Sequence, residues 1–144
     1  MKCYRCTKEV SNPQFKTCDK CRTYLRVYRK KWELHQYHNN PQYRIARIGR
    51  SRVTHAFKRI GTAKTQHTID YIGCTPAHLK AHIEQLFKPG MTWQNLGVVW
   101  EVDHTIPIMY RKPTEAEVIS RLHYTNCAPL WVHANRTKGN RYIG

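Results

Sequence analysis

The fold is decided by the stretch Val98-Val99-Trp100-Glu101-Val102-Asp103-His104. Residues 98–102 are mostly β-branched or aromatic and predict a strand. The strand ends in an Asp-His pair, so that a metal ligand and a base would stand side by side at its terminus. Because side chains alternate between the two faces of a strand, Glu101 shares the face of Asp103, and we leave its role open.

The chain continues from this strand with polar residues at fixed distances. Asn126 stands twenty-two residues after His104. Asn135 follows nine residues later, and Lys138 three residues after that. An Asp-His pair alone is a weak signal, because adjacent polar residues often cap a turn, but the complete series is specific.

The spaced series resembles the motif of the HNH endonucleases, and within them the compact bacteriophage-type members. The resemblance covers residues 42–144 well and residues 1–41 loosely. It implies an α+β chain with a small ββα-metal nuclease core, flanking helices and an N-terminal zinc-binding unit, in a homing, restriction or DNA-packaging role. The residues that carry the resemblance are Asp103-His104, Asn126, Asn135, Lys138, Gly73-Cys74-Thr75-Pro76, Leu79, Phe87-Lys88-Pro89-Gly90-Met91-Thr92-Trp93 and Asn95.

The resemblance also implies catalytic roles. His104 would take a proton from water, because imidazole titrates near neutral pH. Asn126 would brace the loop that aims His104. Lys138 and Arg136 would lie on the closing helix and neutralise the phosphate, although a solvated charge is an equally good interpretation of Arg136.

A divalent ion is implied at the same place, held by Asp103 and Asn135. The classical motif ends in histidine where this chain has Asn135. An asparagine ligates a hard cation through its carbonyl oxygen, so two oxygen ligands favour Mg²⁺ or Mn²⁺ over zinc. His133, two residues earlier, is the alternative ligand.

A second metal site is predicted from the cysteines at the N-terminus. Cys3-x-x-Cys6 and Cys18-x-x-Cys21 form two knuckles, and four thiolates in this arrangement fit one structural Zn²⁺. The disulfide alternative requires an oxidising compartment, and the sequence shows no sign of export. The other two of the six cysteines are expected to be buried free thiols.

The charge is strongly positive, with 25 Lys and Arg against 9 Asp and Glu, for a formal +16. Residues 16–60 hold thirteen of the basic residues against two acids, or +11. Such a balance suits a polyanionic partner, and we expect double-stranded DNA. The residues predicted to contact phosphates are Arg22, Arg26, Arg29, Lys30, Arg44, Arg47, Arg50, Arg52 and Arg136.

Three helices are predicted upstream of the strand. In residues 22–33 an apolar stripe of Tyr24, Val27, Tyr28 and Trp32 is expected to pack, opposite a basic face. Residues 42–60 repeat the pattern, although Gly49 makes a continuous helix less certain. The third helix is expected to begin at Thr75-Pro76 and to end at Lys88-Pro89-Gly90.

These patterns divide the 144 residues into three segments. They are a zinc unit with a basic helix (residues 1–37), a basic helical connector (38–73) and the nuclease core (74–144). No run of 18 apolar residues and no signal-peptide core is present, which predicts a cytoplasmic protein, in the host cytoplasm if it is phage-encoded.

The function expected from the sequence is metal-dependent hydrolysis of DNA, by nicking or by double-strand cutting. The alternative is a zinc-stapled nucleic-acid-binding protein with an inactive nuclease centre. An RNA-binding protein of ribosomal type would explain the charge and the zinc but not the spacing of the motif. The target sequence, and whether a homodimer forms on DNA, are left open.

Overall fold

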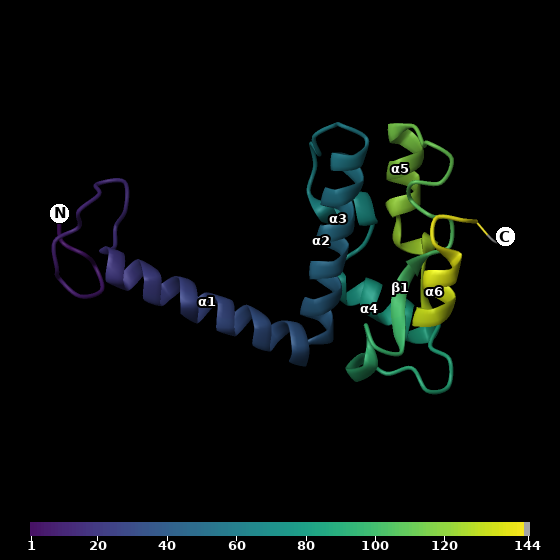
Figure 1. Ribbon diagram of the computed structural model, residues 1–144, viewed down its shortest axis with the longest axis horizontal. Coiled ribbons are helices and arrows are strands. Elements are labelled where there is room, and N and C mark those ends of the chain that lie inside the picture. Colours follow the sequence, from purple (N-terminus) through teal and green to yellow (C-terminus); the bar gives the residue numbers. More distant parts are fainter. Residues whose placement is uncertain (143–144) are drawn as a thin grey trace. The chain divides into compact units, whose positions relative to one another are not determined.

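The computed structural model describes residues 1–142 and shows a mostly helical α+β protein (Figure 1). It divides into two compact units, residues 1–38 and residues 39 onward. Within the described residues no helix is both long and apolar enough to cross a membrane. Because the boundary falls near residue 38, the segment expected as a connector belongs to the second unit and packs within it.

The first unit consists of the cysteine knuckles followed by α1 (Asp19–Asn39). A single antiparallel bridge between Lys2 and Glu9 closes the first knuckle. The apolar stripe of α1 was predicted to pack, but no residue of this helix is buried. The knuckles contact the beginning of α1, where Arg22 lies over the ring of Phe15 and Arg5 over the ring of Tyr24.

The second unit begins with α2 (Pro41–Arg59), which is continuous through Gly49. The Asn40 side chain accepts a hydrogen bond from the Tyr43 backbone and caps its start. A Cβ at Gly49 would lie 2.6 Å from Cδ1 of Ile72. Gly49 therefore serves close packing between α2 and α3 (Thr68–Ile72), and does not break the helix.

The next helix, α4 (Pro76–Gln85), starts as predicted, with the Thr75 hydroxyl accepting from the His78 backbone. It ends at Gln85, before the predicted Lys88-Pro89-Gly90 turn, and a 3₁₀ turn, η1 (Trp93–Asn95), leads into the first strand. α2 packs on α4, and its buried residues Ile45, Val53 and Phe57 form the helical side of the core.

Two strands form the only sheet of the described residues. β1 (Trp100–His104) pairs antiparallel with β2 (Cys127–Trp131), from Trp100 opposite Trp131 to His104 opposite Cys127. The chain between them forms α5 (Glu115–Leu122) and η2 (Tyr124–Asn126), and α6 (Val132–Lys138) follows β2 directly. α6 packs on both strands, and Figure 1 shows it beside β1.

Candidate functional site

A cavity of about 280 Å³ lies between α2 and the strand–strand–helix element. It brings together four of the predicted site residues: Asp103, His104 and Asn135 of the predicted catalytic centre, and Arg52 of the predicted phosphate contacts. Its wall on the other side comes from α2. The full lining is Arg52, His55, Ala56, Arg59, Val102, Asp103, His104, Pro107, Ile108, Met109, Asn135, Gly139 and Asn140.

His104 ends β1 on its core-facing side and is only 7% exposed. Burial, together with the positive charges of Arg52 and Lys138, lowers its pKa to about 3. His104 is therefore neutral at physiological pH. A ring nitrogen without a proton is the form that a general base requires.

The low pKa of His104 predicts acid-sensitive folding. In the unfolded chain its pKa would be the ordinary 6.5, so the unfolded state gains a proton first as the pH falls. The stabilisation is complete above about pH 6.5 and is lost toward pH 3, at a slope approaching about 1.4 kcal/mol per pH unit.

This slope can be measured by urea unfolding between pH 7 and pH 4. His104→Asn should unfold with a shallower pH dependence than the wild type, whereas His55→Gln, which changes an exposed histidine, should keep the wild-type slope. Equal slopes for the wild type and His104→Asn would contradict the burial of a neutral His104.

Lys138 lies beside Asp103 and is nearly as buried as His104. Its Nζ donates to Oδ2 of Asp103 at 2.5 Å and to the backbone carbonyl of His104 at 2.7 Å. The ammonium therefore joins α6 to the end of β1 and neutralises the Asp103 carboxylate. In this arrangement the Lys138 ammonium is engaged by Asp103 and by the His104 carbonyl. Its direct contact with a phosphate stays a prediction.

Asn126 fastens the loop that follows β1. Its Oδ1 accepts from the Ile106 backbone N–H at 2.9 Å, and its Nδ2 donates to the carbonyls of Ile106 at 2.9 Å and Arg121 at 2.8 Å. The loop begins directly after His104. These contacts have the geometry expected of a brace for His104.

Removing this brace should destabilise the second unit. Asn126→Ala deletes three hydrogen bonds to part-buried backbone groups, and we expect a loss of about 2–4 kcal/mol in the free energy of unfolding. Urea unfolding followed by tryptophan fluorescence measures it. Asn140→Ala is the control, because exposed Asn140 makes one such bond, to the Met109 carbonyl. Similar losses in both variants would argue against the brace.

Glu101 and Asn135 are joined across the strand–helix boundary. Nδ2 of Asn135 donates to Oε2 of Glu101 at 2.7 Å. The amide is thereby oriented, and its carbonyl oxygen stays available as a ligand. Glu101, whose role the sequence left open, positions the Asn135 amide. Exposed His133 does not line the cavity.

Among the ionisable residues that line the cavity, His55 and Arg59 were not among the predicted site residues. Both are exposed residues of α2 and share one side of the helix with Arg52, at spacings of three and seven residues. The spacing of these residues is visible in the sequence. It indicates a shared site only once α2 is known to face the Asp-His pair.

The predicted phosphate contacts differ in their surroundings. Arg44 donates to the Leu96 carbonyl at 2.5 Å, and Arg22 pairs with Asp19, so both have partners within the protein. The exposed members are Arg26, Arg29, Lys30, Arg47, Arg50, Arg52 and Arg136.

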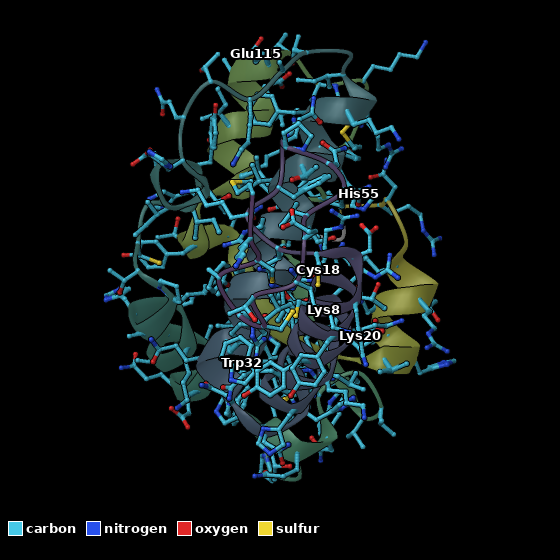
Figure 2. The ribbon with its side chains drawn as sticks, turned by 90° about the vertical axis from the view of Figure 1, so that its left-hand side faces the viewer. Lys8, Cys18, Lys20, Trp32, His55 and Glu115 are labelled. Carbon is cyan, nitrogen blue, oxygen red and sulfur yellow. The ribbon has the colours of Figure 1, made fainter. Side chains whose placement is uncertain are left out.

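The four N-terminal cysteines converge as predicted. Their sulfur atoms all lie within 4.8 Å of one another, and Sγ of Cys6 is 3.5 Å from Sγ of Cys18. Sulfur ligands about 2.3 Å from a tetrahedral metal would be about 3.8 Å apart, so the set fits one ion. Figure 2 labels Cys18, which precedes the first residue of α1.

Backbone N–H groups support thiolates in this cluster. The N–H of Cys18 is the main cause that lowers the pKa of Cys3 to about 6, and the N–H of Cys21 lowers that of Cys18. Without a metal, the side-chain hydrogen bond with Cys6 raises the pKa of Cys21 to about 12. Cys127 is buried and free, as predicted, and Cys74 is free and half-buried.

Comparison with known proteins adds one relative. No family model and no solved structure matches the chain. An uncharacterized protein of Acanthamoeba polyphaga mimivirus is 29% identical over 109 residues, which are 75% of this chain and 47% of that protein. The chain thus spans about half the length of the curated relative it matches.

Proposed function

We propose that this protein is a metal-dependent DNA endonuclease of the HNH type, which hydrolyses phosphodiester bonds with His104 as general base. One observation carries the proposal: the strand–strand–helix element brings Asp103, His104 and Asn135 to a single cavity. The sequence motif alone could not establish that these residues meet. The relative's name assigns no activity, so the proposal rests on the site itself.

His104 is suited to accept a proton from the attacking water. It is neutral at physiological pH, and the loop after it is held by Asn126. A phosphate entering the cavity would offset the charges of Arg52 and Lys138, which now oppose protonation of the ring. Burial, the largest cause of the low pKa, would persist, so the phosphate would raise the pKa of His104 only in part.

The residues at the cavity fit a divalent ion with oxygen ligands. Asp103 and Asn135 would hold it, and phosphate and water oxygens would complete the shell. Such an ion supplies positive charge against the negative charge that develops in the transition state. Lys138 would keep the Asp103 carboxylate aimed, because its ammonium is fixed by the His104 carbonyl as well.

The cysteine cluster would hold a structural zinc. Four sulfur ligands close the coordination shell, so no position is left for substrate. Its contribution would be to fold the first unit, where Cys3, Thr17 and Cys18 are the buried residues. So small a buried set supplies little hydrophobic stabilisation by itself.

DNA as the partner can be tested on α1. Neutralising exposed Arg26, Arg29 and Lys30 together should weaken binding to any DNA sequence. It should also flatten the slope of log affinity against log salt by roughly 0.9 per lost contact. A salt titration with a labelled duplex in Ca²⁺ measures the slope.

The matched control neutralises Lys88, Arg111 and Lys112, which are exposed and lie outside residues 16–60. It removes the same charge and should change the slope less. An equal change in both triple variants would show that only net charge matters and would remove α1 from the DNA-binding surface.

The enzymatic proposal is tested with supercoiled plasmid. The protein should convert it to relaxed or linear DNA in the presence of Mg²⁺ or Mn²⁺, and not in EDTA. DNA binding with no conversion under any divalent ion would favour the zinc-stapled binding protein.

A further inference from the structure

Helix α2 presents three basic or ionisable side chains to the cavity. Arg52, His55 and Arg59 line it together and are all exposed. Their spacings of three and four residues place them on one side of the helix. Ala56, between them, also lines the cavity and is buried, so a small side chain separates the long ones. Figure 2 labels His55 on α2.

The charge of this row is not balanced inside the protein. Within residues 1–142 neither Arg52 nor Arg59 forms an ion pair. The one carboxylate that lines the cavity, Asp103, is already paired with Lys138. Two guanidinium groups and an imidazole therefore face a hollow that contains no uncompensated negative charge, and such a hollow attracts an anion.

The other basic residues of α2 are placed differently. Arg44 donates to the Leu96 carbonyl, and Arg50 lines a separate hollow with Lys64 and His67. Lys58 is exposed but does not line the cavity, although it is next to Arg59 in sequence. Of the basic residues of α2, only some therefore line the cavity.

We propose that Arg52, His55 and Arg59 form a phosphate-binding row that holds the DNA backbone at the bond to be cut. The inference rests on the proposed nuclease function and deepens it. Seven residues of helix span about 10 Å, enough to contact more than one phosphate of a strand. Guanidinium groups suit phosphate oxygens geometrically, and a row opposite Asp103 and His104 would place the scissile phosphate between them.

This row differs in effect from phosphate contacts elsewhere. Contacts remote from the cavity add affinity alone, whereas contacts to the reacting phosphate orient it and stabilise its developing charge. The row should therefore affect the cleavage rate even when all DNA is bound. That rate is the measurement that separates the row from a generally basic surface.

The experiment compares neighbouring variants of the full-length protein. Arg59→Gln and Lys58→Gln remove one charge each from adjacent positions, and His55→Ala is matched by Thr54→Ala. Single-turnover cleavage of supercoiled plasmid is measured at saturating protein with Mg²⁺. Affinity for a fluorescein-labelled duplex of random sequence is measured in Ca²⁺, and thermal melting checks that each variant is folded.

Arg59→Gln and His55→Ala should each lower the saturated rate at least about tenfold, and Arg52→Gln should do the same. Lys58→Gln and Thr54→Ala should stay within about twofold of the wild type. Equal rates for Arg59→Gln and Lys58→Gln at saturation would overturn the row while leaving the nuclease function in place.

If the wild-type protein does not cleave the plasmid, the proposed nuclease function is wrong, but the phosphate-binding row can still be tested by the affinity measurement. The row survives as a phosphate-binding site if Arg59→Gln weakens duplex binding several-fold more than Lys58→Gln does. If the two variants bind the duplex with the same affinity, the phosphate-binding row is wrong as well.

Discussion

Replacing His104 with alanine should reduce plasmid cleavage at least about a hundredfold while leaving the affinity for DNA nearly unchanged. A general base typically accelerates a reaction by that factor or more. It acts on water and contributes little to binding in the ground state, so affinity should be spared. The cleavage rate with Mg²⁺ and duplex affinity in Ca²⁺ are measured on the same preparation.

The controls for this variant address folding and histidine content. Because His104 is buried, the alanine variant must show a cooperative thermal transition before its rate is interpreted. His78→Ala removes an exposed histidine of α4 outside the cavity and should cleave like the wild type. Cleavage by the folded His104 variant at more than about a tenth of the wild-type rate would remove His104 from the role of base.

Removing one cysteine of the cluster should unfold the first unit and spare the second. We expect about one zinc per chain in the wild type and none in Cys18→Ser, because a structural site of this kind derives its folding energy from the metal. Limited proteolysis should then cleave the first eighteen residues readily. The core around Trp100 belongs to the second unit and should keep its near-ultraviolet circular dichroism.

Cys74→Ser is the matched variant for the zinc experiment. Cys74 is a free thiol outside the cluster, so its replacement should leave the zinc content at the wild-type value. Wild-type protein without zinc, or with the four N-terminal cysteines paired as disulfides, would contradict the assignment. Loss of the second unit in Cys18→Ser would contradict the independence of the two units.

Much of the local structure could be predicted from residue pattern. The apolar run over residues 98–102 predicted a strand, and the structure has it two residues later, as β1 (Trp100–His104), with Val98 and Val99 in the turn before it. Thr75-Pro76 marked the start of α4, because helix capping is a local property. The convergence of the four cysteines followed from the short spacing within each knuckle. In each case the residues that decide the outcome are neighbours in sequence.

Features that depend on distant contacts could not be predicted. Gly49 looked like an interruption of a helix and is instead the point where Ile72 approaches. The ion pair of Lys138 with Asp103, thirty-five residues away, was not expected, whereas its contact with a phosphate stays a prediction. The apolar stripe on α1 was expected to pack, yet no residue of this helix is buried. The residue pattern contains no information on which element would cover the stripe.

For the candidate site too, residues that are close in sequence could be predicted and residues that meet only in the fold could not. Asp103 and His104 could be assigned from the sequence because a single strand carries both. Arg52 of α2 was predicted as a phosphate contact, but His55 and Arg59 could not be assigned to the site. They precede the Asp-His pair by more than forty residues and reach the cavity only through the packing of the second unit.

Plasmid cleavage by two proteins purified in parallel measures whether this chain hydrolyses DNA. Wild-type protein and His104→Ala are incubated with supercoiled plasmid in Mg²⁺, in Mn²⁺ and in EDTA. We expect relaxed or linear DNA from the wild type with either ion, and intact plasmid in EDTA and with the variant. Intact plasmid in all reactions, or equal cleavage by both proteins, would contradict this expectation.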